Sequence, residues 1–476
     1  MNLKLNKSKK TVDLTEYGET AVPKHALSFL TQKELLAVQH ILRRLVTITS
    51  DLEGKNYLFK TASSIGVIET HGLRVQVRPR LSAREFITLV RYALSGNLPP
   101  DHFKSHSELT WETGFEDALC MLLNDEAREI LRVGLSRRYE ERREPLDVLR
   151  GRPLWERNFP WQGGKAREIV CRYHKLTYNN LDNRLLLSGL KSAAVLARSE
   201  DARRGIFQHL KTFRELASET TPELTQFERV EQGYNRLSEH YRAAHGLCRI
   251  LLYNLRPDSF YDDGKHLVFG LVLDMAWLFE KFVERFMIEA LKPIGFTVQP
   301  QRPDGRALLD AERYRYASVR PDLEVWRSEK VHGVVDAKYK RYWAAGADGF
   351  YPARKISNED LYQLFFYQQR LQRKYNLAYP PTAIIASPLP EEDERDGYTS
   401  ISDRFKRIIW QAGSEKAGDV RLLLIPVTKF LRLLEQREKP VDIMTKLGMD
   451  DLPGMFLGKK GISQNARFSQ SGNGIH

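Results

Sequence analysis

The stretch from Arg320 to Lys340, RPDLEVWRSEKVHGVVDAKYK, constrains the fold most, because polar residues separate two short strand-like runs in it. Val331 to Val335 form the second run, and valine-rich runs of this length favour strands joined as a hairpin. This run leads into Asp336 and Lys338, which are two residues apart and therefore on one face of a strand. If the strands pair, Asp322 lies near Asp336, and the two carboxylates can hold Mg²⁺ while a phosphate and water fill its other positions. The lysine beside them could stabilise charge on the phosphate.

Taken alone, this D-x-K pattern is weak, because an Asp at a strand end is usually a turn former and a strand Lys is usually a solvated edge charge. The flanking segments strengthen it. Residues 271–291, LVLDMAWLFEKFVERFMIEAL, predict a largely buried helix with Glu280 and Glu284 on one face. Residues 358–371 predict a second helix with Gln363 and Tyr367 on one face and an N-cap at Ser357 or Asn358.

The order of a helix, a hairpin ending in D and D-x-K, and a helix with Q-x-x-x-Y is that of PD-(D/E)xK nucleases. The chain resembles the McrC family, the nuclease subunits of McrBC modification-dependent restriction systems. Within the nuclease part the resemblance is carried by LFEKFV at 278–283, RPD at 320–322, DAKYK at 336–340 and DLYQ at 360–363. Upstream, IGVIETHGLRVQVRPRL at 65–81 and NNLDNRLL at 179–186 also resemble that family, and they extend the likeness over most of the chain.

This resemblance implies a role for each residue at the site. Asp322 and Asp336 would bind the metal, Lys338 would be the catalytic lysine, and Glu280 would be the acidic residue that the helix contributes. Gln363 and Tyr367 match the Q-x-x-x-Y element found near the site in several branches of the superfamily.

Two positions stay open at this stage. Glu324 follows Asp322 by two residues, faces the same side of the strand and competes with it as the first metal ligand. Glu284 competes in the same way with Glu280, although an i to i+4 surface charge pattern also accounts for it. The motif positions favour Asp322 and Glu280.

Composition is that of a globular chain and favours a polyanionic partner, although charge alone also suits a membrane surface, a ribosome or a basic protein that is merely soluble. The 476 residues are 42% hydrophobic and carry a net charge of +13, which favours phosphate neutralisation and counterion release. Cys120, Cys171 and Cys248 are too far apart in sequence to indicate a zinc cluster or a disulfide framework. The longest apolar run, 267–279, contains an aspartate and is shorter than the roughly 20 residues that span a bilayer. With no signal peptide pattern at the N-terminus, we expect a cytoplasmic protein without membrane contact.

The predicted fold class is mixed α/β. An N-terminal mixed domain is expected over 1–150, in contact with a motor partner, DNA or both. A basic region and helical connector follow over 151–255, and a PD-(D/E)xK nuclease domain over 256–440 has a central mixed sheet flanked by helices. A disordered tail is expected over 441–476. The predicted helices are 84–94, 115–133, 181–196, 205–216, 227–255 and 428–436, and the later strands are 382–386 and 421–426.

The densest basic region runs from 137 to 172, with aromatic residues among its arginines. Arginines can grip phosphates while aromatic rings stack on bases, so we consider it a DNA-binding surface, with a solvated charged face as the alternative. Its glutamates, among them Glu140, Glu141 and Glu144, suit ion pairs within a helix. The residues assigned to DNA contact are Arg137, Arg138, Arg142, Arg143, Arg152 and Lys340.

No G-x-x-x-x-G-K-[ST] loop occurs in the sequence, so we expect nucleotide hydrolysis to reside in a partner. The resemblance implies that this partner is an McrB-like AAA+ GTPase ring, which the N-terminal region contacts and stimulates. The expected function is a DNA endonuclease subunit that cleaves modified double-stranded DNA with Mg²⁺, for which Mn²⁺ can substitute. The alternatives are a stand-alone PD-(D/E)xK nuclease and a catalytically idle DNA-binding adaptor that activates an AAA+ ring.

Overall fold

The fold was analysed in a computed structural model. It describes residues 5–6, 9–30, 39, 42–43, 45–69, 73–95, 111, 114–158, 168–253, 269–302, 304–309, 311, 314–340, 342, 356–389, 405–412, 415–449 and 452–457. The chain forms two compact units. Unit 1 comprises Met1–Val67, Gly72–Thr110 and Val272–His476, and unit 2 comprises Ile68–His71 and Trp111–Leu271. Mixed helices and sheets confirm the predicted α/β class, and no helix among the described residues is long and apolar enough to cross a membrane.

Unit 1 begins with two small sheets. The first has the order β3-β5-β4, and all its strands are antiparallel. The second has the order β1-β2-β7-β6-β11, in which β2 and β7 are parallel; residues 68–69 of β6 and 269–271 of β11 belong to unit 2. Their bounds are β1 Leu5–Asn6, β2 Lys9–Thr15, β3 Glu19–Pro23, β4 Val46–Ser50, β5 Asn56–Thr61, β6 Ser64–Glu69, β7 Leu73–Arg78 and β11 Phe269–Asp274, with a 3-10 turn at Lys24–Leu27. A tight turn at residues 16–18 joins β2 to β3.

An aromatic cluster joins three helices of unit 1: α2 (Ala83–Ser95), α9 (Met275–Leu291) and α13 (Val427–Glu435). The ring of Tyr92 on α2 lies 5.5 Å from Phe282 and 5.2 Å from Phe430, measured between centroids. The Tyr92 hydroxyl also donates a hydrogen bond of 2.7 Å to Glu289 on α9. These contacts fix α9, so the helix that carries Glu280 has a defined position. The helix predicted over 271–291 therefore begins at Met275, because residues 271–274 belong to β11 and Asp274 caps α9.

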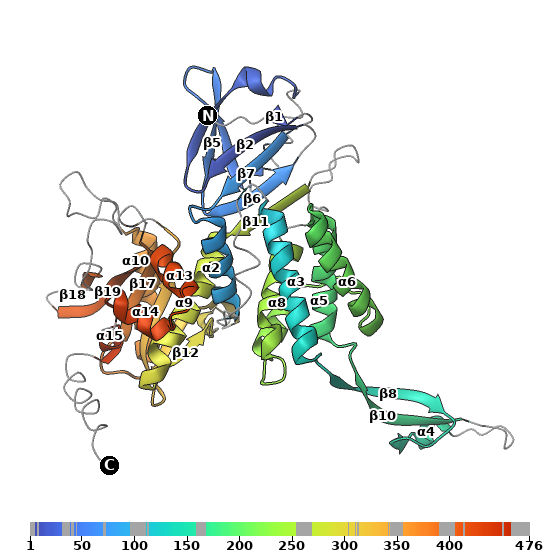
Figure 1. The fold of residues 1–476 in the computed structure, drawn as a ribbon. Helices are drawn as coiled ribbons and strands as arrows, with labels where there is room; N and C mark the ends of the chain where they lie inside the picture. Colours follow the sequence, from blue (N-terminus) through green and yellow to red (C-terminus); the bar gives the residue numbers. More distant parts are fainter. Residues whose placement is uncertain are drawn as a thin grey trace, which may run out of the picture. The chain divides into compact units, whose positions relative to one another are not determined.

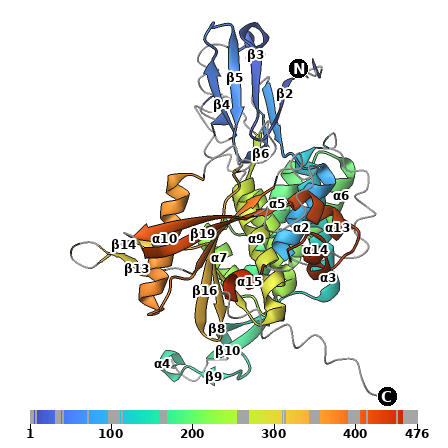
Figure 2. The same ribbon diagram turned by 90° about the vertical axis from the view of Figure 1, so that its left-hand side faces the viewer.

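The rest of unit 1 is a six-stranded mixed sheet of order β12-β15-β16-β17-β19-β18, seen with its helices in Figures 1 and 2. The predicted hairpin is confirmed as β15 and β16, which pair antiparallel, whereas β16, β17 and β19 run parallel. Parallel neighbours need a crossover, and α10 supplies the one between β16 and β17. The bounds are β12 Thr297–Pro300, β15 Leu323–Arg327, β16 Lys330–Ala337, α10 Asn358–Lys374, β17 Thr382–Pro388, β18 Phe405–Ala412 and β19 Glu415–Ile425, beside a β13–β14 pair at Asp304–Leu309 and Arg315–Val319.

The helix α10 covers the sheet face that carries Val334, Ile385 and Leu422, and it contributes Leu364 and Leu371 to the same core. Val334 and Asp336 are two residues apart on β16, so Asp336 lies on this face of the sheet too. The hydrophobic packing of α10 thereby sets the distance between the D-x-K strand and the helix that bears Gln363.

Two short helices follow the sheet, α14 at Pro440–Lys446 and α15 at Gly454–Leu457. These residues were expected to belong to a disordered tail, and that prediction is wrong for the described part of 441–457. Phe456 and Leu452 are buried, so this segment has the apolar content to pack. The remainder of the predicted tail, 458–476, lies outside the described residues.

Unit 2 contains a bundle of helices whose bounds are α3 Phe115–Val133, α5 Leu181–Leu196, α6 Glu200–Leu216, α7 Leu224–Gln232 and α8 Arg242–Tyr253, with a 3-10 turn at Glu239–Tyr241. The prediction of one helix over 227–255 is wrong, because a non-helical segment separates α7 from α8. Gly233 ends α7, and the Asn235 side chain then accepts a hydrogen bond of 2.9 Å from the Leu237 backbone N–H. An asparagine that bonds its own backbone in this way favours a turn over a helix.

A β-ribbon projects from the bundle within unit 2 (Figure 1). It consists of β8 (Arg138–Leu146) and β10 (Ile169–Thr177), with the short β9 (Arg152–Pro153) and α4 (Trp155–Asn158). The intrahelical ion pairs expected for this segment are therefore wrong. Glutamates pair with arginines two residues further along the strand instead, Glu140 with Arg142 at 2.7 Å on one face and Glu141 with Arg143 at 2.6 Å on the other.

Candidate active site

The β15–β16 hairpin brings Asp322 and Asp336 together. Leu323 pairs with Val335, which places Asp322 opposite Asp336 in this antiparallel register. The Asp322 Oδ2 atom accepts a hydrogen bond of 2.8 Å from the backbone N–H of Ala337. The Asp336 side chain is almost completely buried, with 1% of its surface exposed. Two carboxylates thus converge where the strands end, as the pattern predicted.

Lys338 lies at the centre of a set of hydrogen bonds that links β16 to α10. Its Nζ atom is 2.8 Å from Asp336 Oδ2, and it donates a hydrogen bond of 3.0 Å to Gln363 Oε1. Gln363 Nε2 in turn donates to the hydroxyl of Tyr367 at 2.8 Å, and this hydroxyl donates to the carbonyl of Arg320 at 3.3 Å. The structure therefore joins the Q-x-x-x-Y pair to the lysine and returns to the strand that carries Asp322.

Glu280 reaches the site from α9, where its Oε1 atom accepts a hydrogen bond from Gln301 Nε2. The backbone N–H of Gln301 donates to the carbonyl of Asp322 at 2.8 Å, so one residue connects both acids. Gln301 has a φ of 44°, a left-handed conformation that a non-glycine residue seldom adopts. Glu284, the competing acid on this helix, forms an ion pair with Lys281 at 3.1 Å instead.

The site contains more acids than cations, and this imbalance affects the pKa values of its side chains. Burial, followed by the charges of Asp336 and Glu280, raises the pKa of Asp322 to about 8. Burial also raises the pKa of Asp336, against the opposing effect of Lys338, and burial raises the pKa of Glu280. For Lys338, burial would lower the pKa, but Asp336 and the neighbouring acids outweigh it and raise the pKa. The site therefore holds an excess of buried acids over cations.

This excess fits a divalent cation. Among the described residues, no three His, Cys, Asp or Glu side chains are already arranged to hold a metal ion together. The site offers the facing carboxylates of Asp322 and Asp336, with Glu280 bound to Gln301 behind them. Mg²⁺ is commonly held by one or two carboxylates together with water and substrate phosphates, so two facing acids suffice.

Comparison with known proteins establishes the family. The model of the family described as McrBC 5-methylcytosine restriction system component matches residues 59–380, which is more than half of the chain and includes all six candidate catalytic residues. The chain belongs to this McrBC family. No curated protein matches the chain.

Two solved structures from Thermococcus gammatolerans are similar to this McrBC-family chain. One is described as a refined half-complex from a tetradecameric assembly of McrB AAA+ hexamers with bound McrC. The alignment has 18% identity and a TM-score of 0.46, and it covers 90% of this chain and 100% of the other. The second is described as the McrBC complex, with 19% identity and a TM-score of 0.39 over 59% of this chain and 88% of the other.

In this McrBC-family chain, the carboxylate of Glu324 has partners other than the two facing acids. It is buried, accepts a hydrogen bond of 3.0 Å from Trp326 Nε1 and lies 3.8 Å from the Arg302 guanidinium. These partners occupy its carboxylate, so we expect Glu324→Gln to leave Mg²⁺-dependent cleavage within about twofold of the wild type, an effect too small for the loss of a metal ligand. Single-turnover cleavage at saturating Mg²⁺ checks this, and a loss as large as that of Asp322→Asn would make Glu324 the first ligand.

Two side chains at the site went unnoticed in the sequence. Asp360, in the first turn of α10, accepts hydrogen bonds of 2.8 and 3.0 Å from Lys340 and lies 3.8 Å from Lys338. It belongs to the DLYQ motif, so a signal was present. No sequence signal marked Gln301, because its left-handed backbone and its hydrogen bond to Glu280 depend on the tertiary structure.

The residues assigned to DNA contact fall into two groups. Lys340 lies beside the site with its side chain 48% exposed, while it pairs with Asp360. The others belong to unit 2, whereas the candidate catalytic residues belong to unit 1. Several have partners there: the Arg137 guanidinium stacks 4.7 Å from the Tyr178 ring, and Arg138 pairs at 3.1 Å with the buried Asp182. As shown above, Arg142 and Arg143 pair with glutamates, and Arg152 is exposed on β9.

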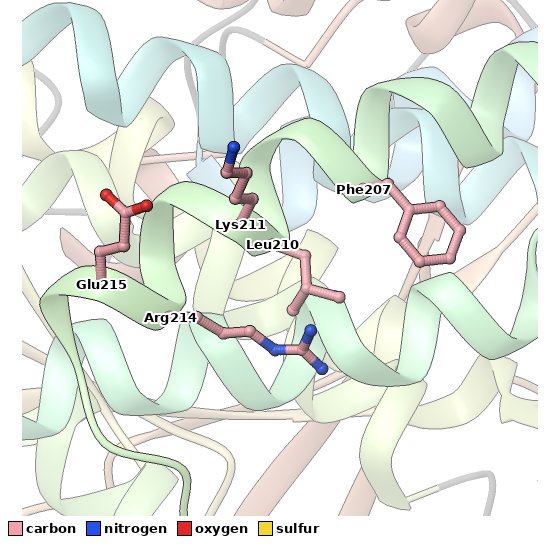
Figure 3. Close-up of a pocket in the computed structure, with 5 residues that line it drawn as sticks. All are labelled: Phe207, Leu210, Lys211, Arg214 and Glu215. Carbon is pink, nitrogen blue, oxygen red and sulfur yellow. The ribbon is translucent and has the colours of Figure 1, made fainter.

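A pocket of about 460 Å³ is found in unit 2, on the surface of α6. Figure 3 shows that all five lining residues come from that one helix, with an exposed phenylalanine at one end and charged side chains along it. They are Phe207, Leu210, Lys211, Arg214 and Glu215. None of the candidate catalytic residues lines this pocket, and it lacks facing acids.

Proposed function

We propose that this chain is the Mg²⁺-dependent DNA endonuclease subunit of an McrBC-type restriction system and acts in the cytoplasm on modified double-stranded DNA. The observation that carries the proposal is the position of Lys338 Nζ, 2.8 Å from Asp336, directly after the end of β16 where Asp336 faces Asp322. Membership of the McrBC family supports the same role.

The residues of the site suit hydrolysis of a phosphodiester. Asp322 and Asp336 would hold the cation, with Glu280 orienting a water or a second ion behind them. When bound, the cation supplies Lewis-acid stabilisation of the phosphate and makes water more acidic. The Lys338 ammonium donates a hydrogen bond to Gln363 and forms ion pairs with Asp336 at 2.8 Å and Asp360 at 3.8 Å. From this position its charge would stabilise the pentacovalent transition state of a phosphate bound at the facing acids.

Gln363 and Tyr367 act on the position of the lysine. An ammonium on a four-carbon stem is flexible, and ordering it before the substrate arrives lowers the entropic part of the barrier. The hydrogen bonds from Lys338 to Gln363 and from Gln363 to Tyr367 supply this order.

The partner we propose is an McrB-like AAA+ GTPase ring that this chain binds and stimulates. The sequence has no P-loop of its own, and the similar solved structures are McrB AAA+ hexamers with bound McrC and an McrBC complex. The exposed Arg152 and Lys340, together with the arginines of β8, are the proposed DNA contacts.

Co-purification with the candidate ring protein, followed by cleavage assays with Mg²⁺ on methylated and unmethylated DNA, tests the proposal. We expect cleavage only with the ring protein, Mg²⁺ and a hydrolysable nucleotide together, and Mn²⁺ should replace Mg²⁺. GTP and ATP are compared in parallel arms. Cleavage by the isolated chain without nucleotide would indicate a stand-alone nuclease. Stimulated hydrolysis without any cleavage would indicate an adaptor that activates the ring.

A further inference from the structure

Tyr339, the residue that follows the proposed catalytic lysine, contacts a part of unit 1 more than 300 residues away in sequence. Its hydroxyl donates a hydrogen bond of 2.9 Å to the carboxyl of Glu16, and these residues are 323 positions apart. Its ring also packs 5.6 Å from Phe279, the neighbour of Glu280 on α9. The D-x-K segment is therefore in contact with the N-terminal sheets as well as with the nuclease sheet.

Glu16 is one of the most deeply buried acids of the chain, with 1% of its surface exposed. Its Oε1 atom accepts the Tyr339 hydroxyl and also the backbone N–H of Arg80 at 2.9 Å. Its own N–H donates to the carbonyl of Arg78 at 2.9 Å, so the backbone of the β2–β3 turn is fixed to the end of β7. Burying a carboxyl group costs free energy, and these hydrogen bonds offset part of that cost.

Tyr17, the next residue of the turn, holds the backbone of the same segment. Its hydroxyl donates a hydrogen bond to the carbonyl of Tyr339, and the two rings lie 6.0 Å apart. Tyr17 has a φ of 52°, the left-handed conformation that is unfavourable for a residue with a side chain. The turn thus binds Tyr339 at its side chain and at its main chain, and it does so with a strained residue.

From these contacts we propose that the Glu16–Tyr339 hydrogen bond positions Lys338 and connects the N-terminal sheets to the nuclease site, an inference that rests on the proposed function. Glu16 and Tyr17 are positioning residues, since neither touches the acids or the lysine directly. After Ala337 the chain leaves β16, so Lys338 depends on what holds the residues on either side of it. On one side this is the sheet, through the Lys338 N–H bonded to the Ala386 carbonyl at 2.8 Å. On the other side it is Tyr339, which is hydrogen-bonded to Glu16 and Tyr17 of the turn.

The form of the hydrogen bond indicates which substitutions are informative. Burial raises the pKa of Glu16. Its Oε1 atom accepts both hydrogen bonds, whereas among the described residues its Oε2 atom has no hydrogen-bond partner. Glutamine presents a carbonyl oxygen in the same place, whereas alanine removes the acceptor from Tyr339 and from Arg80.

The test compares Glu16→Gln, Glu16→Ala and Tyr339→Phe in single-turnover DNA cleavage by the full complex. We expect Glu16→Ala and Tyr339→Phe to lower kcat about 10- to 100-fold with an unchanged KM for DNA, because a displaced lysine weakens the transition state and not substrate binding. Glu16→Gln should stay within about threefold of the wild type. The double variant Glu16→Ala/Tyr339→Phe should be no slower than the slower single variant, as two partners of one contact require.

Glu19→Ala is the matched control, since Glu19 is a half-exposed acid three residues further along that pairs with Lys60 at 3.1 Å, and its loss should leave cleavage unchanged. Hydrogen exchange of the Lys338 and Lys340 amides provides a readout that is independent of activity, and it should be faster in Glu16→Ala at an unchanged melting temperature. Wild-type cleavage and exchange in Glu16→Ala would overturn the inference. So would a Glu16→Gln variant as slow as Glu16→Ala, since charge would then matter and not the hydrogen bond. If the wild type itself does not cleave, the proposed function fails, and exchange still decides whether the contact orders Lys338.

Discussion

Lys338→Ala and Asp336→Ala are each expected to abolish Mg²⁺-dependent DNA cleavage, with a loss of at least about 100-fold in single-turnover rate. Lys338 lies 2.8 Å from Asp336 and is the cation beside the facing carboxylates, so no described neighbour in the site can replace its charge. Asp322→Asn should cause a loss of the same size. Binding to the ring partner and stimulation of its nucleotide hydrolysis should persist in all three variants, because the changes are confined to the end of one hairpin.

Metal affinity separates the roles of these residues. Calorimetric titration with Mn²⁺ should show weaker binding for Asp336→Ala and Asp322→Asn. Lys338→Ala should bind the ion at least as tightly as the wild type, because it removes a competing positive charge from the same carboxylates. Lys340→Ala is the matched lysine control: its side chain is 48% exposed, and its loss should raise the DNA concentration needed for cleavage without lowering kcat. Full activity of both Lys338→Ala and Asp336→Ala would remove the basis of the site.

Gly189→Ala is expected to destabilise unit 2 by about 2–3 kcal/mol, equivalent to a fall of roughly 5–10 °C in melting temperature. Gly189 lies on α5, where it lets α8 approach closely. A Cβ atom added at this position would lie 2.1 Å from the Cys248 sulfur and 2.8 Å from its Cβ, distances that force the helices apart. The intrinsic helix preference for alanine, about 0.5–1 kcal/mol, offsets only part of this cost.

Gly205→Ala is the matched control for that prediction. It is also a helical glycine of unit 2, but an added Cβ would meet only the end of the Asn124 side chain, which can move away. Its effect on the melting temperature should be small. Exchanging the two partners, Gly189→Ala with Cys248→Gly, should recover much of the lost stability because it restores the space between α5 and α8. A Gly189→Ala protein as stable as the wild type would mean that these helices do not pack this closely.

Sequence reasoning succeeded where local pattern and tertiary structure agree. The α/β class, the hairpin at 323–337 and the helices that begin at Phe115 and Leu181 are confirmed, because valine-rich runs and apolar helix faces determine them without help from distant residues. The facing position of Asp322 and Asp336 follows from the same hairpin, since antiparallel pairing leaves little freedom in register once the turn is known.

Predictions failed where partners far along the chain decide the outcome. The region from Arg138 to Leu146 has the charges of a surface helix, yet it forms a strand because Ile169–Thr177 pairs with it. The conformation of Gln301 and the contact between Glu16 and Tyr339 depend on segments that no short pattern relates to one another. In the sequence, Glu284 and Glu324 both remained candidate metal ligands. In the structure, Glu284 forms an ion pair with Lys281, and Glu324 accepts a hydrogen bond from Trp326.

The division of unit 1 has a consequence for how the protein is made. The described helices of unit 2 lie within one stretch of the chain, from Phe115 to Tyr253, so they can pack on one another as soon as they leave the ribosome. The helix α2 is synthesised earlier, yet the partners of its buried Tyr92 come much later, Phe282 on α9 and Phe430 on α13. The apolar face of α2 therefore lacks these partners until α9 and α13 have been synthesised. The candidate site, which α9 helps to build, is therefore among the last parts of the chain to assemble, and an incomplete chain lacks it.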